Sequence, residues 1–146
     1  MSFSAKVKGE ICRYTDISIE EALAEISAIM KGSGTIGFSG RGLSFKITTE
    51  NPASARHIFT ILKEYFDIHS KLMVKKSNSL KKNNIYMVLI DEEMGVRDLL
   101  KKTGIFQEID GVLTLDYKID PEMIKTDEYK RAYIRGAFIG GGSISN

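Results

Sequence analysis

Hydrophobic and polar positions along this chain change period several times, and each change marks an element. The first clear helical pattern follows Ser18, which forms a capping box with Glu21 three residues later, and it ends at the Gly32/Gly34 pair. A shorter helix is predicted before it, over residues 3–13. The chain therefore begins with two helical segments.

Two short strands are predicted next, from the segments "TIGFSG" and "LSFKITT" joined at "GRG". In the second segment Leu43, Phe45 and Ile47 alternate with polar residues. Because successive side chains of a strand point to opposite faces, this alternation predicts one buried face and one solvent-exposed face.

Asn51 followed by Pro52 has the form of an N-cap with proline at the first helical position, so a helix is predicted through about Tyr65. Its predicted apolar face consists of Ala55, Ile58, Phe59, Leu62 and Phe66.

A second hairpin is predicted from strands at 70–76 and 85–90, joined by the polar segment "SNSLKKNN". A helix over 96–102 follows and is stopped by Gly104. The predicted order is αββαββα, which is an α+β fold.

The remaining segment predicts short extended pieces turning at Asp110-Gly111 and one helical turn opened by Asp120-Pro121. Asp127 is the expected cap of a last helix.

Composition indicates one globular domain of 146 residues, 42% hydrophobic and 27% charged, with no apolar stretch long enough to cross a bilayer. We expect a cytoplasmic protein without a membrane segment. Cys12, the single cysteine, is interpreted as a small buried hydrophobe on a helix, because no Cys or His lies nearby at zinc spacing. The net charge is only +2, but five lysines and no acidic residue lie between Lys71 and Lys82.

One apolar, glycine-rich segment occurs twice, within 22–36 and again within 131–145, and matching positions such as Ala24 and Ala132 lie 108 residues apart. On a helix, positions four apart share a ridge, so each copy carries a stripe with almost no side-chain volume, which lets two helix axes approach closely. Helix-ending caps explain some of the glycines but not two matched ridges. The predicted helix–helix interface is Ala24, Ala28, Gly32, Ala132, Gly136 and Gly140.

The repeated helix ahead of the αββαββ order resembles the LAGLIDADG homing endonucleases, in which two such helices pack at a pseudo-twofold axis and two saddle-shaped sheets straddle DNA. The segments "MSFSAKVKGEICR", "LKKNNIYMV" and "RAYIRGAFIGGGSIS" more closely resemble the N-terminal part of the bacterial WhiA family, regulators linked to sporulation and cell division. That family continues into a helix-turn-helix domain, which this sequence lacks. The resemblance implies a first LAGLIDADG-like half at 1–126 and the start of a truncated second half at 127–146.

The same resemblance bears on catalysis. A LAGLIDADG nuclease has one acidic residue at the foot of each motif helix, and the two carboxylates hold divalent cations. At the matching positions this sequence has Ser33 and Gly141, which supply no carboxylate. We therefore predict no catalytic residue, no metal, no cofactor and no enzymatic activity.

Basic side chains at alternate strand positions suit contact with phosphates. Because of the LAGLIDADG and WhiA resemblance, the expected partner is double-stranded DNA, in a nucleoid-associated protein. A lysine-rich hairpin is also typical of a solvated edge protected against aggregation, and the rival function is a protein-interaction module whose DNA binding is done by the absent helix-turn-helix domain. The candidate DNA-binding residues are Arg41, Lys46, Lys71, Lys75, Lys76, Lys81 and Lys82.

Other polar residues receive structural interpretations. His57 and His69 are read as ordinary surface or partly buried histidines, since no triad spacing surrounds them. The run 91–93 is read as the acidic first turn of a helix rather than a metal cluster.

The end of the chain leaves an open question about assembly. We expect Ile134, Phe138 and Ile139 to be partly uncovered, so that the last helix either packs back on the first motif helix or pairs between chains. A protein partner in transcription or cell division and self-association are both expected on this reading.

Overall fold

The computed structural model describes residues 6–8, 16–76 and 84–141, and the statements below concern these residues. Residues 6–8 are helical, as predicted, while the rest of the helix expected at 3–13, including Cys12, lies outside the described residues. The tip of the second hairpin, with Lys81 and Lys82, lies outside them too.

The predicted αββαββα order is confirmed. None of the helices in the described part of the chain is long and apolar enough to span a membrane. The seven elements are α2 (Ile19–Ser33), β1 (Gly34–Ser39), β2 (Gly42–Thr49), α3 (Pro52–Phe66), β3 (Lys71–Lys75), β4 (Ile85–Asp91) and α4 (Val96–Lys102).

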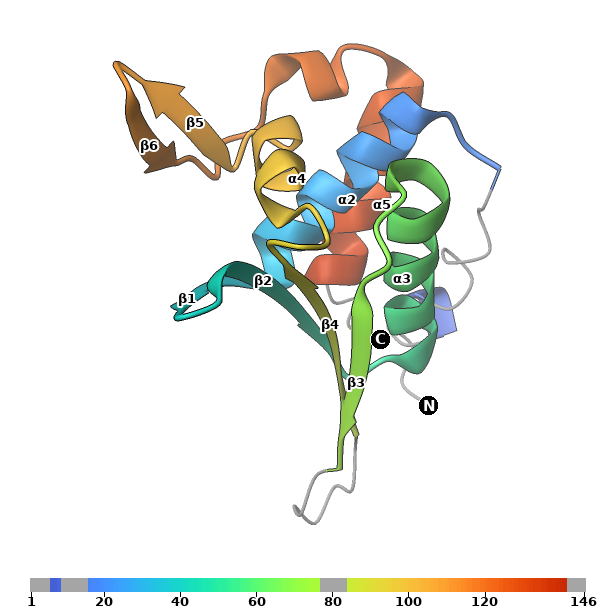
Figure 1. Ribbon diagram of the computed structural model, residues 1–146. Helices are drawn as coiled ribbons and strands as arrows, with labels where there is room; N and C mark the ends of the chain where they lie inside the picture. Colours follow the sequence, from blue (N-terminus) through green and yellow to red (C-terminus); the bar gives the residue numbers. More distant parts are fainter. Residues whose placement is uncertain (1–5, 9–15, 77–83, 142–146) are drawn as a thin grey trace.

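The four strands form one antiparallel sheet in the order β1-β2-β4-β3, with both hairpins side by side. Figure 1 shows this sheet as a curved layer with the helices gathered on one side of it. The alternation in β2 is confirmed, because Leu43, Phe45 and Ile47 are buried while Lys46 between them is exposed. The sheet therefore has a covered face and an open face.

The core lies between the covered face and the helices. Phe45, Ile47, Val88 and Ile90 supply it from the two central strands, and α2, α3 and α4 pack on them. Removing these side chains from water supplies most of the stabilisation of such a layer.

Helix α3 begins as predicted, because the Asn51 side chain accepts hydrogen bonds from the backbone N–H groups of Ala53, at 2.9 Å, and Ser54, at 3.2 Å. Its buried face differs from the prediction: Phe59 and Phe66 are only half-buried, whereas Ser54 and His57 lie in the interior.

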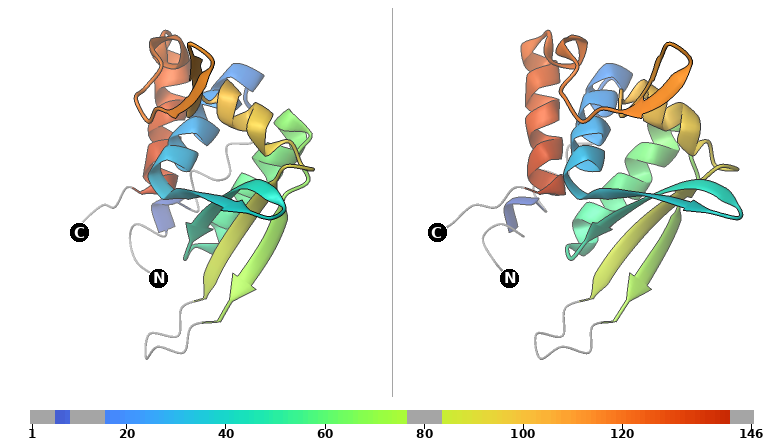
Figure 2. Two further views of the ribbon diagram at one scale, coloured as in Figure 1. Left: turned by 60° about the vertical axis from the view of Figure 1, so that its left-hand side comes forward. Right: turned by 90° about the vertical axis from the view of Figure 1, so that its left-hand side faces the viewer.

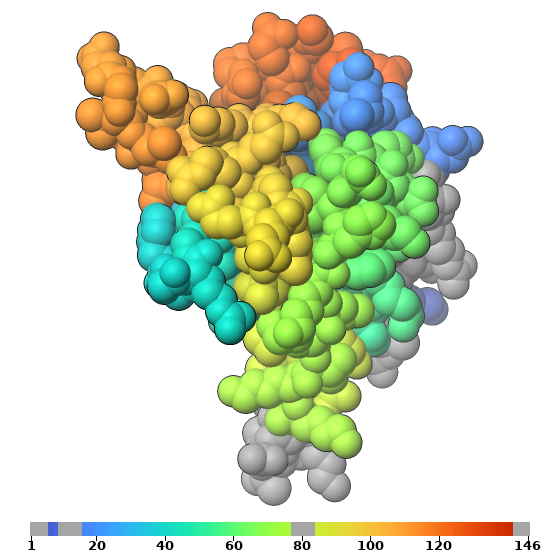
Figure 3. All heavy atoms as spheres, in the orientation of Figure 1, coloured from blue at the N-terminus to red at the C-terminus, as the bar shows by residue number. Residues whose placement is uncertain are grey.

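The second part of the chain forms a hairpin of β5 (Phe106–Ile109) and β6 (Val112–Leu115), the short helix η1 (Pro121–Ile124) and α5 (Asp127–Gly140). Asp110 and Gly111 both have positive φ, 52° and 77°, which a tight two-residue hairpin turn requires. Figure 3 shows the hairpin standing out from the body of the molecule. Asp120 caps η1 as expected.

The expected cap of α5 was wrong. The Thr126 side chain accepts from the Tyr129 N–H at 3.1 Å, and Asp127 is the first helical residue. Threonine and aspartate are both good caps, so the sequence placed the helix start within one residue.

Candidate nucleic-acid interface

Helices α2 and α5 lie side by side and run in the same direction toward the sheet, as both views of Figure 2 show. The contact is so close that it leaves no room for a side chain at the glycine positions: a Cβ added to Gly136 would lie 2.9 Å from the carbonyl carbon of Glu25 and 3.0 Å from the Cβ of Ala28. A Cβ on Gly32 would lie 3.2 Å from the carbonyl carbon of Gly140. Residues 108 apart in sequence therefore face each other.

The remaining ridge residues support the same register. Ala24 and Ala132 are fully buried and belong to one cluster with Met123, and Gly140 packs on the backbone of Ile29. The structure thus brings the two predicted ridges together within one chain.

Ser33 and Gly141 lie where the two helices end. The Ser33 hydroxyl donates to the Ile29 carbonyl at 3.2 Å, and a Cβ on Gly141 would lie 3.8 Å from the Gly32 carbonyl oxygen. The described residues contain no group of three or more His, Cys, Asp or Glu side chains that could hold a metal ion. Neither position offers a carboxylate to a cation.

The open face of the sheet carries the predicted lysines in a defined register. Lys46 on β2 lies opposite Thr35 on β1 and Leu89 on β4, and Leu89 lies opposite Lys71 on β3. Directly opposed residues of an antiparallel pair share a face, so these four side chains form one row across the sheet.

The next rows toward the hairpin tip are mostly apolar. Thr48, Met87 and Met73 form one row, and Ile85 and Lys75 form another. The apolar members Met73, Met87, Leu89 and Ile85 are half-buried. The open face is thus an apolar centre with Lys46 on one side and Lys71 and Lys75 on the other.

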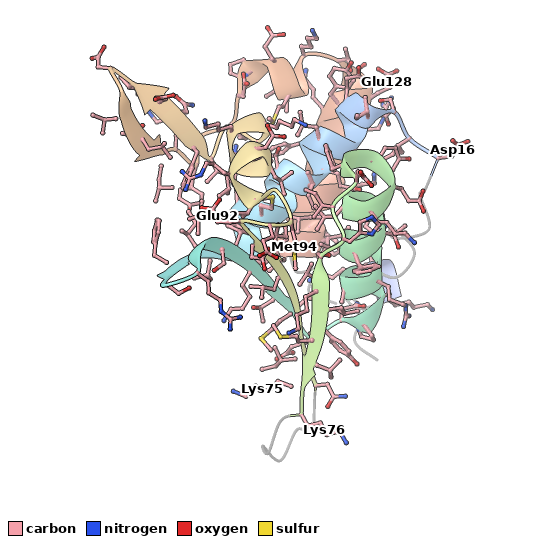
Figure 4. All side chains as sticks on the ribbon, in the orientation of Figure 1. Asp16, Lys75, Lys76, Glu92, Met94 and Glu128 are labelled. Atoms are coloured by element: carbon pink, nitrogen blue, oxygen red, sulfur yellow. The ribbon has the colours of Figure 1, made fainter. Side chains whose placement is uncertain are left out.

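Two further predicted residues lie at the margins. Arg41 is exposed in the β1–β2 turn, where its backbone N–H donates to the Ser39 hydroxyl at 3.2 Å. Lys76 follows the end of β3, on the opposite side of the strand from Lys75 in Figure 4. The sheet therefore brings Lys46, Lys71 and Lys75 onto one face and leaves Lys76 off it.

Acidic groups are sparse on this face. Asp91 is in the row of Ser44 at the far end, and its carboxylate accepts from the Met94 N–H at 3.1 Å. Lys46 and Lys71 form no ion pair with a carboxylate of the described residues. Their charges are available to a partner.

The acidic run at 91–93 is not a helical first turn, and this prediction was wrong. A turn intervenes and α4 starts after Gly95, whose φ of 96° a glycine adopts readily. The Glu92 carboxylate instead accepts from Arg97 Nη2 at 2.7 Å and from the Leu43 N–H at 3.3 Å. The bond from Arg97 lowers the pKa of Glu92. Figure 4 shows Glu92 in this turn.

His57 is the residue that sequence reasoning misjudged most. It is 5% exposed, and its Nε2 lies 3.0 Å from Oε2 of Glu25, which is 0% exposed. On the other side of that carboxylate, Arg135 Nε donates to Oε1 at 3.1 Å. The available signal was Glu25 itself, a carboxylate among buried apolar positions of a helix, because a buried charge requires partners. His69 is exposed beside Asp67, as expected of an ordinary surface histidine.

Lys31 is a second polar residue held by the fold. Its Nζ donates to the Lys118 carbonyl at 2.8 Å and lies 5.9 Å from the centroid of the Tyr133 ring. Burial lowers the pKa of Lys31, opposed by Asp116 and Asp120. This lysine ties α2 to the segment before η1.

The last helix is covered more than expected. Ile134 is 65% exposed and Phe138 is half-buried, but Ile139 is 2% exposed, so its expected exposure was wrong. Ile139 belongs to the main core, because α5 packs back on α2 within the chain.

Comparison with known proteins bears on this fold directly. The family model of the WhiA N-terminal LAGLIDADG-like domain matches residues 20–106. The chain belongs to the WhiA family. It is 77% identical over 146 residues to the "Probable cell division protein WhiA" of Clostridium beijerinckii, covering all of this chain and 46% of that protein.

Solved WhiA structures share the fold. The N-terminal LAGLIDADG domain of DUF199/WhiA matches with a TM-score of 0.64 and 20% identity, covering 96% of this chain and 58% of that one. Full-length DUF199/WhiA from Thermatoga maritima matches with a TM-score of 0.62 and 19% identity, covering 100% of this chain and 41% of that one. The predicted LAGLIDADG-like α+β class is confirmed.

The WhiA family match spans α2 through the start of β5, so it includes the whole sheet and every described lysine of the open face. The chain spans about half the length of its curated WhiA relatives, 46% in the comparison above. The division into 1–126 and 127–146 stays a prediction.

Proposed function

We propose that this chain is a non-cleaving, DNA-binding scaffold of a bacterial transcriptional regulator of cell division and sporulation, and that it holds DNA against the open face of its sheet. The observation that carries the proposal is the row that places Lys46 and Lys71 on the side of the sheet that none of the described helices covers. Lysines on such a face neutralise phosphates and release counterions.

The spacing of the lysines suits a duplex. Lys71 and Lys75 are four residues apart on β3, or about 13 Å at roughly 3.3 Å per residue. That distance is close to the width of the B-DNA major groove, about 12 Å. The backbone positions of the two lysines are therefore about one groove width apart, and we expect them to contact phosphates on opposite sides of a groove, with Lys46 contacting the same duplex from β2.

The absence of cleavage follows from the helix ends. The LAGLIDADG nucleases hold their cations with one carboxylate at the end of each motif helix, and Ser33 and Gly141 supply no carboxylate there. We expect the protein to leave supercoiled plasmid intact with Mg²⁺ or Mn²⁺. Reproducible nicking that disappears on substitution of Ser33 or Gly141 would overturn this part of the proposal.

Binding is tested by fluorescence anisotropy of a labelled duplex across a salt series. Each phosphate that the protein neutralises adds roughly 0.9 to the steepness of log K against log salt. We expect K46E and K71E each to weaken binding and flatten the slope. The matched control is K63E, an equal charge reversal on α3, on the helical side of the sheet.

Two results would count against DNA as the partner. If K63E weakens binding as much as K46E, the effect is net charge alone. If the wild-type protein does not bind a duplex even at low salt, the open face belongs to the second candidate, a protein-interaction module. The apolar centre formed by Met73, Met87 and Leu89 favours that candidate, because such side chains are common at protein interfaces.

A further inference from the structure

The contact between α2 and α5 is symmetric in its small residues but not in its charges. Ala28 faces Gly136 and Gly32 faces Gly140, each pair 108 positions apart, so either helix presents nearly the same ridge to the other. Because the ridge is alike on both helices, the small residues fit a contact between two copies of α2 as well as they fit the α2–α5 contact.

The charged contact breaks this symmetry. Glu25 of α2 is bound by Arg135 of α5, Nε to Oε1 at 3.1 Å, and Arg135 Nη2 also lies 3.9 Å from Oε2 of Glu21. The same offset of 108 positions relates Glu25 of α2 to Tyr133 of α5, and Arg135 of α5 to Ser27 of α2. If the two helices were exchanged, Ser27 and Tyr133 would lie where Arg135 and Glu25 lie, and neither of them carries a charge.

The pair is also removed from solvent. The Glu25 side chain is 0% exposed and that of Arg135 is 17% exposed. His57 of α3 lies 3.0 Å from the second carboxylate oxygen of Glu25. This contact holds Glu25 in place whichever helix packs against α2. A buried carboxylate held in this way favours a helix that brings a cation.

We infer that the Glu25–Arg135 pair makes α2 select α5 as its partner and reject a second copy of itself. In an α2–α2 contact across a twofold axis, each Glu25 would face Ser27 of the other chain. In an α5–α5 contact, each Arg135 would face Tyr133. The first arrangement leaves the buried Glu25 with His57 but without Arg135, and the second leaves Arg135 without Glu25. Losing the partner of a buried ion pair is strongly unfavourable, whereas the α2–α5 contact keeps both charges paired.

A cysteine on the small-residue ridge of α2 distinguishes an α2–α5 contact within one chain from an α2–α2 contact between two chains. Ala24 faces its equivalent Ala132 in the buried cluster, so an α2–α2 contact would bring residue 24 of two chains together. The test compares covalent dimer formed under mild oxidation by C12S/A24C and by C12S/A24C/E25Q/R135M. The E25Q change keeps a hydrogen-bonding group for His57, and the R135M change fills the space of the arginine without charge.

We expect the protein with the intact pair to form almost no covalent dimer and the neutralised protein to form at least about tenfold more. Cross-linking is preferred to a mass measurement, because association through the exposed Ile134 side of α5 would also raise the mass. The conservative variant R135K in the cysteine background keeps the charge, so it should stay largely uncross-linked.

The inference is overturned if the neutralised protein keeps its circular dichroism spectrum and still forms no more dimer than the parent. R135Q in the same background provides the second test if the quadruple variant does not fold, since it removes one charge only and should also raise the dimer yield. An R135K variant that dimerises as readily as R135Q would equally contradict the role of the charge.

Discussion

At the scale of single residues, the decisive feature is that glycine and alanine line the closest contact between α2 and α5. Glycine costs a helix roughly 1 kcal/mol relative to alanine, so an alanine at a free helical position should stabilise the protein. At Gly136 the backbone of Glu25 occupies the place of the missing Cβ. Here the collision outweighs helix propensity.

G136A should therefore lower the free energy of unfolding, by about 1–3 kcal/mol, the usual cost of overpacking a filled contact. Urea denaturation followed by circular dichroism measures it. The control is G40A, because a Cβ on Gly40 would meet no atom within 4 Å. A G136A protein as stable as wild type would mean that the helices lie farther apart than described.

The same scale shows what a sequence can predict about individual residues. The cap residues Ser18 and Asn51 were predicted because their partners lie two or three positions away. The surroundings of Glu25 were not, because its partners His57 and Arg135 lie 32 and 110 residues along the chain. Which distant helix supplies a counter-charge depends on packing.

At the scale of elements, the strands and helices of the first half were predicted well because each has a local signature, such as the alternation in β2. The errors fall at junctions. The run 91–93 has the composition of a helical first turn, but Glu92 is bound by Arg97 and by the backbone of Leu43 instead. This carboxylate connects the turn after β4 to both α4 and β2.

The Glu92 contact gives the stability of this junction a pH dependence. Its folded-state pKa lies below the ordinary value of 4.5, so its contribution is present above pH 4.5 and is lost as the pH falls through the lowered value. E92Q should flatten the fall in urea midpoint between about pH 5 and pH 3, relative to wild type. E93Q, which removes the charge of the exposed neighbouring carboxylate, is the charge-matched control. Equal slopes in wild type, E92Q and E93Q would argue against the contact.

At the scale of the whole molecule, one side of the sheet holds the core and the other is covered by none of the described helices. The motif helices pack within the chain, the open face carries Lys46, Lys71 and Lys75, and the β5–β6 hairpin stands apart from both. The sequence was enough to name the lysines as candidates for DNA binding. The register of the paired strands was needed to show that Lys46 and Lys71 share a row. Register depends on long-range pairing.

Nuclear magnetic resonance tests the proposed binding of duplex DNA to this open face residue by residue. Amide resonances of the ¹⁵N-labelled protein are followed during titration with a short duplex. We expect salt-sensitive shifts at Lys46, Lys71, Lys75 and Leu89, with α3 and the β5–β6 hairpin unchanged. Shifts confined to the helices or the hairpin, with the open face unaffected, would contradict it.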